Sequence, residues 1–196
     1  MELAARQAAL LADTSPFCRF AECGICELLV DYLGDRLHLT TWVIAELEHR
    51  AKQAAHAQLR SLEARNPSWV TNPPVQLTEP ELRRADALAR GWSKLQARRS
   101  GSHRDDRANL GETTTILAAE KHDWAVILDE GRARAYAEKR GLTVLSTQDL
   151  VVEMTAVEQL KGRRAFHIYK RVYSNATETG FTRAVASAQD ALDSPL

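Results

Sequence analysis

Residues 108–134 read ANLGETTTILAAEKHDWAVILDEGRAR, and they hold a predicted helix and a predicted strand in direct succession. Residues 112–121 are rich in helix formers, which predicts a helix with Glu112 in its first turn. The apolar run 124–128 is typical of a parallel strand that is buried on both faces. Ligands usually bind beyond the carboxyl ends of such strands, so Asp129 lies where a site is expected. The alternative is that Glu112 is a solvated first-turn acid and Asp129 a capping residue.

Two further acids occupy comparable places earlier in the chain. The apolar run 8–12 ends at Asp13, before a Thr-Ser-Pro turn that favours a helix start, so a second strand would deliver a carboxylate. A long helix is predicted over 40–65, and Glu46 lies in it. Glu46 has either a role in a site or the structural role of balancing Arg50 four residues later.

The rest of the chain continues the alternation of strands and helices, which predicts an α/β fold with a parallel sheet. We expect two short helices in 17–33 broken near Gly24, a strand at 37–39, an extended piece at 75–77, a helix at 81–99, a helix at 131–140, a strand at 142–145, and helices at 148–160 and 164–175. Residues 1–160 would form one domain with a helical insertion at 66–107. Residues 161–196 would form a C-terminal helix and, because 176–196 is polar and weakly patterned, a mobile tail.

Composition excludes several classes of protein. The chain has 196 residues and a formal net charge of zero, so it can bury one full core and carries no global charge that attracts nucleic acid. No apolar run is long enough to span a membrane and no signal peptide is evident, so we expect a cytoplasmic protein. Cys18, Cys23 and Cys26 favour buried thiols, because a zinc site needs four ligands and no second cysteine pair exists.

The most basic neighbourhood precedes the central stretch and includes Arg98, Arg99, Arg104 and Arg107. Such a charged helix end is either a solvated face or a surface that contacts phosphate groups. We expect these arginines to flank the acidic residues and to contact phosphate groups.

The four acids, in their order and context, resemble PIN-domain ribonucleases. The resemblance rests on Asp13 after the first strand, Glu46 in TTWVIAEL, Glu112 in NLGETTTI, and Asp129 in VILDEGRARAYAEKRGLTVLST, and it covers about residues 8–160. It implies a three-layer α/β/α sandwich with a central, mainly parallel sheet, here with a helical insertion and a C-terminal helical extension. It also selects Glu46 over the neighbouring Glu48 as the fourth acid.

The resemblance further implies a metal-dependent endoribonuclease in which Asp13, Glu46, Glu112 and Asp129 are the catalytic acids. Asp13, Glu112 and Asp129 would bind Mg²⁺ or Mn²⁺, since hard oxygen ligands favour these ions over zinc. Arg134, with Arg98, Arg99 and Arg104, would bind the RNA. Many members of the family are toxins of bacterial toxin–antitoxin pairs, which implies a small antitoxin partner; a homodimer is also expected.

Thr114 and Glu130 depart from the pattern of the family. Thr114 stands where this branch often has another acid, and Glu130 replaces the second Asp of the usual pair. Two alternatives follow: a PIN-fold binding module without catalytic activity, or another doubly wound α/β domain in which Asp13 and Asp129 serve a different ligand. No glycine-rich phosphate loop occurs, which speaks against a nucleotide-binding version of the second alternative.

Overall fold

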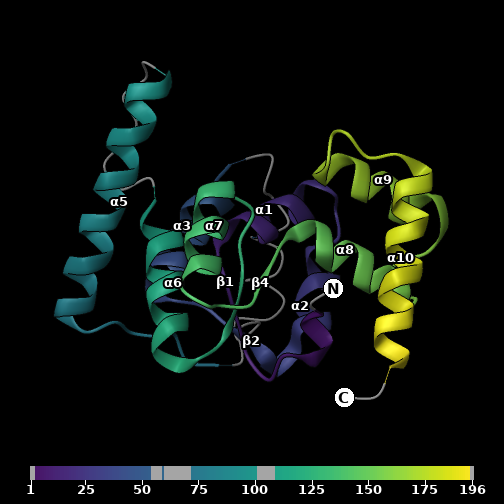
Figure 1. Cartoon of the computed structure of the whole chain (residues 1–196), viewed down its shortest axis with the longest axis horizontal. Helices are drawn as coiled ribbons and strands as arrows, with labels where there is room; N and C mark the ends of the chain where they lie inside the picture. The colour runs from purple at the N-terminus through teal and green to yellow at the C-terminus, as the bar shows by residue number, and fades with distance from the viewer. Residues whose placement is uncertain (1–2, 54–58, 60–71, 101–108, 195–196) are drawn as a thin grey trace.

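The computed structural model describes residues 3–53, 59, 72–100 and 109–194, and within them the chain folds around a four-stranded parallel sheet (Figure 1). The strand order is β2 (Leu37–His38), β1 (Leu10–Ala12), β3 (Ala125–Ile127) and β4 (Val144–Leu145). The α/β class and the four predicted strands are therefore confirmed, although each strand is shorter than the apolar run that predicted it.

Successive residues of a strand point to opposite faces of the sheet. All residues of β1 and β3 are buried, so helices cover both faces. In β1, Leu10 and Ala12 join the core formed with α1 (Thr14–Glu22), α2 (Cys26–Leu33) and α8 (Thr147–Ala156). Leu11 instead joins the core formed with α5 (Glu79–Ser100), α6 (Leu110–His122) and α7 (Gly131–Lys139). The third helix, α3 (Thr41–Ala51), contacts α1 and α6, and the short turns η1 (Ala4–Arg6) and η2 (Gly34–Arg36) complete this part. This arrangement is compatible with a three-layer sandwich.

The first helix begins directly after β1 because Asp13 caps it with its side chain. The predicted break near Gly24 is confirmed, and the glycine there has a φ of 75°, which other residues rarely adopt. The chain thus turns between α1 and α2 without disturbing the position of the residue that caps α1.

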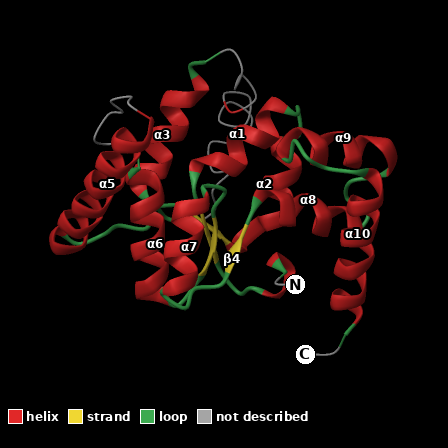
Figure 2. Ribbon diagram, turned by 45° about the horizontal axis from the view of Figure 1, so that its top comes forward, coloured by secondary structure: helices red, strands yellow, loops and turns green. Residues whose placement is uncertain are grey.

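The expected mobile tail is wrong. Residues 176–196 contain a helix, α10 (Glu178–Asp193), which packs on α8 and α9 (Gly162–Val172) at the end of the molecule remote from α5 (Figure 2). Phe181 and Ala188 are buried in this packing. The predicted helix at 164–175 is confirmed as α9, with Ile168 and Tyr169 buried.

Two other helices differ from the prediction. The helix expected over 40–65 ends at Ala51, and most of the stretch beyond it (54–58 and 60–71) lies outside the described residues. The helix expected at 81–99 is confirmed as α5, which begins at Glu79 and ends at Ser100, and its Leu95 is 51% exposed. The extended piece near 75 is confirmed by a parallel bridge between Val75 and Thr40.

None of the described helices is long and apolar enough to cross a membrane. The three cysteines are free thiols, of which Cys26 is buried and Cys18 and Cys23 are half-buried. The prediction of buried thiols therefore holds fully only for Cys26.

Candidate functional site

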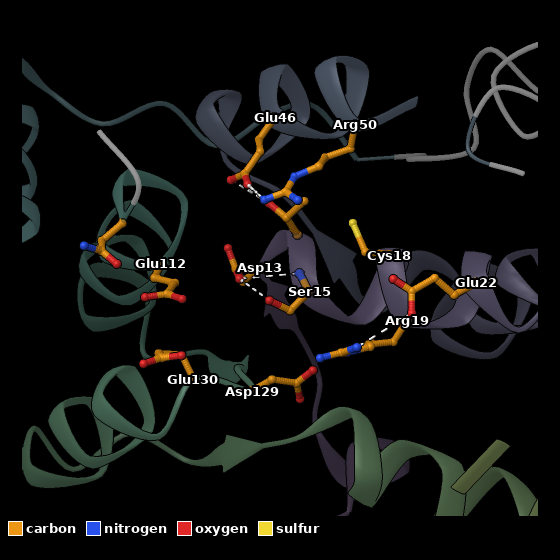
Figure 3. A pocket seen from close by; sticks show the side chains of 12 residues that line it. Asp13, Ser15, Cys18, Arg19, Glu22, Glu46, Arg50, Glu112, Asp129 and Glu130 are labelled. Atoms are coloured by element: carbon orange, nitrogen blue, oxygen red, sulfur yellow. Dashed lines mark hydrogen bonds and ion pairs between the residues drawn. The ribbon is translucent and has the colours of Figure 1, made fainter. Parts of the chain in front are cut away.

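An open cavity of about 440 Å³ lies at the carboxyl ends of β1 and β3 (Figure 3). All four predicted acids line it, although the elements that carry them are far apart in the sequence. The cavity is therefore strongly acidic. Its lining consists of Asp13, Thr14, Ser15, Cys18, Arg19, Glu22, Glu46, Arg50, Asn109, Glu112, Asp129 and Glu130.

Asp13 is the most buried acid of the cavity, with 4% of its surface exposed. Its Oδ2 accepts hydrogen bonds from the Ser15 hydroxyl at 3.1 Å and, more weakly, from the Ser15 N–H at 3.5 Å. Burial raises the pKa of Asp13 to about 6, and the negative charge of Glu46 adds to the increase. The helix-capping hydrogen bonds only partly offset the cost of ionising this carboxyl group.

Glu112 lies in the first turn of α6, as predicted, and one of its oxygens, Oε2, is buried with no hydrogen-bond partner among the described residues. Burial is the main reason that the pKa of Glu112 rises to about 8, followed by repulsion from Asp13, Glu130 and Glu46. A buried carboxylate oxygen without a partner is costly, so the site lacks a positive charge or a donor at this point.

Gly111 lets the start of α6 approach the other acids. A Cβ at this position would lie 2.9 Å from Oδ1 of Asp13 and 2.9 Å from Oε2 of Glu46. Both oxygens therefore point at the same spot beside the helix backbone. Gly111 lies inside the first turn of α6, one residue before Glu112.

Glu46 forms the predicted ion pair and also lines the cavity. Its Oε1 accepts a hydrogen bond from Arg50 at 3.1 Å, which is the predicted ion pair at a spacing of four residues. Its Oε2 accepts one from the hydroxyl of Thr14 at 2.9 Å and faces the cavity. The ion pair thus holds Glu46 beside Asp13 rather than removing it from the site.

Asp129 lines the cavity but also stabilises the start of α8. Its Oδ1 accepts a hydrogen bond from the Thr147 N–H at 2.8 Å, and its Oδ2 accepts one from the Thr147 hydroxyl at 2.7 Å. Asp129 therefore has structural contacts with the first residue of α8, but the N-cap residues of α7 and α8 are Glu130 and Ser146. Glu130 is exposed and precedes α7 without a capping hydrogen bond from its side chain.

Thr114, the departure from the family pattern, does not line the cavity. It is fully buried, and its hydroxyl donates to the Leu110 carbonyl at 2.7 Å and lies 3.2 Å from that of Thr40. It connects α6 to the residue that caps α3, so its role is structural.

Of the arginines predicted to bind RNA, the structure describes the side chain of Arg134, and it does not reach the cavity. Arg134 is half-buried on α7 and is not part of the lining. The side chains of Arg98 and Arg99, and all of Arg104 and Arg107, lie outside what the structure describes. The cavity instead has two cations that we did not assign to the site, Arg19 and Arg50. The sequence could have placed Arg50 in the site, because it lies four residues after Glu46. The position of Arg19 depends on the direction of α1, which the sequence does not show.

The oxygen-rich lining fits a hard divalent cation in its chemistry, and Asp13, Glu46 and Glu112 are the acids best placed to hold one. The partnerless oxygen of Glu112 is the observation that favours this fit. In the described part of the chain, however, no three His, Cys, Asp or Glu side chains converge closely enough to hold an ion as they stand. Side chains would have to turn for a cation to be bound.

No protein family, curated protein or solved structure matches the chain. Fold and site together define an α/β protein with an acidic cavity at the carboxyl edge of a parallel sheet.

Proposed function

We propose that this chain is a divalent-metal-dependent endoribonuclease of PIN-like fold. The observation that carries the proposal is the gathering of six carboxylates in one cavity, two of them with strongly raised pKa values and one with a partnerless oxygen. Carboxylates arranged in this way are costly without a cation, and a bound cation removes that cost.

Asp13, Glu46 and Glu112 would hold Mg²⁺ or Mn²⁺, with Asp129 as a further candidate ligand. Once bound, such an ion would lower the pKa of a water molecule and neutralise charge on a phosphodiester. The side chains of Thr14 and Ser15 orient Glu46 and Asp13.

Arg19 and Arg50 lie on the same cavity and can contact substrate phosphate groups, since a guanidinium group matches the geometry of phosphate oxygens. They take the role that was predicted for Arg134. The predicted antitoxin partner, the toxin role and the homodimer stay predictions.

The test is cleavage of single-stranded RNA by wild type, Asp13→Asn and Glu112→Gln with Mg²⁺ or Mn²⁺. We expect both variants to lose cleavage and metal binding together, and EDTA to abolish cleavage by wild type. Asp149→Asn is the control, because Asp149 also lies at a helix start but binds Ser146, outside the cavity. Wild-type cleavage that persists undiminished in EDTA, or in both cavity variants, would overturn the proposal.

A second candidate, a binding module without catalysis, is favoured by the engagement of both Asp129 oxygens with Thr147 and by the lack of three converging acids in the described residues. Thermal unfolding with added Mn²⁺ separates the two functions. A cation at 100 times its dissociation constant should stabilise the nuclease by about 2.7 kcal/mol. Binding of RNA with neither cleavage nor this stabilisation would favour the binding module.

A further inference from the structure

The exposed side of α9 is the most consistently basic helix surface that the structure describes. Its sequence, GRRAFHIYKRV, has no acidic residue, and all its basic side chains are exposed. These are Arg163, Arg164, His167, Lys170 and Arg171.

The arginines of α9 differ from those elsewhere in their partners. On α5, Arg83, Arg84 and Arg90 each form an ion pair with a glutamate or aspartate. Arg164 and Arg171 form no ion pair with another described residue. Their charges are therefore available to a ligand, whereas those on α5 are largely compensated.

Arg164 and Arg171 also line a concave surface. A groove of about 460 Å³ is bordered by Arg164, His167, Ile168 and Arg171 of α9 and by Cys23, which follows α1. Arg164 and Arg171 are seven residues, or about two helical turns, apart on one wall of the groove, so they can hold two phosphate groups of the same strand.

The groove adjoins the acidic cavity through α1. Arg19 and Glu22 of α1 line the cavity, and Cys23, the next residue, lines the groove. Glu22 lies between the two depressions, and Arg19 pairs with it at 3.6 Å. The whole of α1, with nine residues, is about 13 Å long, so a few nucleotides would reach from one depression to the other.

We propose that this α9 groove binds the phosphate backbone of single-stranded RNA whose neighbouring phosphodiester lies in the acidic cavity. The inference rests on the proposed ribonuclease function and names its substrate-binding surface. It is independent of the basic neighbourhood near residue 100, most of which lies outside the described residues.

A nucleic acid fits this surface better than a membrane does. A helix that lies on a bilayer inserts its apolar face, but the apolar face of α9 is already used. Ala165, Ile168 and Tyr169 are buried, and Phe166 packs against Phe181 of α10 with ring centroids 5.8 Å apart. Only the charged side of α9 faces outward.

The experiment compares two double variants of the full chain that remove the same charge from the same helix. Arg164→Ala with Arg171→Ala removes the groove cations, whereas Arg163→Ala with Lys170→Ala removes exposed cations outside the groove. Fluorescence anisotropy of a labelled single-stranded RNA is measured in EDTA from 50 to 200 mM salt, so that cleavage does not interfere.

We expect the groove variant to flatten the log–log salt dependence of affinity by about 1.4 units, since each phosphate contact on a single strand contributes about 0.7. The control variant should change the slope by less than half as much. Equal changes in both variants, no change in the groove variant, or no RNA binding by wild type would overturn the inference. The inference would also be overturned if phosphatidylserine vesicles bound wild type but not the groove variant, while the salt dependence of RNA affinity was the same in both.

Cleavage with Mn²⁺ distinguishes this failure from failure of the proposed function. Wild type that cleaves RNA but shows no groove dependence leaves the ribonuclease proposal standing and refutes the groove. Wild type that binds RNA through the groove but never cleaves it refutes the nuclease and leaves the groove as the surface of a binding module.

Discussion

Asp13→Asn is expected to stabilise the metal-free protein at pH 8, although it changes a buried residue that caps a helix. Burial raises the pKa of Asp13 from 3.8 to about 6, so between these values the folded protein binds a proton that the unfolded chain has lost. The stability that this proton contributes is complete below about pH 4 and is lost as the pH rises through about 6.

The size of the effect follows from the shift in pKa. At about 1.4 kcal/mol per pKa unit, ionised Asp13 costs the folded state about 3 kcal/mol at pH 8. Asparagine carries no charge and is as good a helix cap as aspartate, so it removes this cost and keeps most of the capping. We expect Asp13→Asn to raise the free energy of unfolding by roughly 1–3 kcal/mol at pH 8 and to leave it nearly unchanged at pH 4.

Urea unfolding of wild type and Asp13→Asn in EDTA at pH 4, 6 and 8 measures the difference directly. Asp149→Asn is the matched control: its carboxylate accepts hydrogen bonds from Ser146 at 2.6 and 2.8 Å, so this change should destabilise the protein at pH 8. The reasoning about the buried charge would be refuted if Asp13→Asn were no more stable than wild type at pH 8. It would also be refuted if the free energy of unfolding changed by the same amount at all three pH values.

Two further changes test the cavity and the core. Gly111→Ala should alter stability by less than about 1 kcal/mol, because the gain in helix propensity offsets the displaced carboxylates, but it should weaken Mn²⁺ binding in calorimetry. Gly91→Ala, where a Cβ meets nothing within 4 Å, should leave Mn²⁺ binding unchanged. The buried carboxylate of Glu153 accepts hydrogen bonds from the backbone N–H groups of Ala4 and Ala5. In Glu153→Gln one of these N–H groups would face an amide NH₂ group, so the free energy of unfolding in urea should fall by about 1–3 kcal/mol. Exposed Glu158→Gln should have no measurable effect, and equal effects of the two glutamate changes would contradict the assigned role of Glu153.

The strands could be predicted because each is an apolar run that ends at a turn or a capping residue, and this signal is local. The gathering of Asp13 and Asp129 could be predicted as well, since the carboxyl ends of parallel strands meet at one edge of a sheet. Glu112 was a candidate from its place in the first turn of a predicted helix, whereas the choice of Glu46 required the family resemblance, because nothing in its own helix distinguishes an acid that faces a cavity from one that faces water.

The helix α10 was missed although its pattern was present. Phe181, Val185, Ala188 and Leu192 recur at intervals of three or four residues and pack on the core. The Ala, Ser and Thr residues between them lower the mean hydropathy and mask this periodicity, and the helix needs the surfaces of α8 and α9 to bury its stripe. A helix whose stability comes from packing rather than from its own composition is poorly visible in a single sequence.

The double role of Asp129 depends on strand register, which the sequence does not reveal. Ile127 of β3 pairs with Leu145 of β4, so the residues two positions further along each chain, Asp129 and Thr147, also lie side by side. That register places both oxygens of Asp129 on Thr147 at the edge of the cavity. A change at Asp129 must therefore disturb the start of α8 together with any ligand, and loss of cleavage there would not separate chemistry from structure. Asp13 and Glu112, whose charges the fold leaves largely uncompensated, are the acids on which the functional proposal is tested most directly.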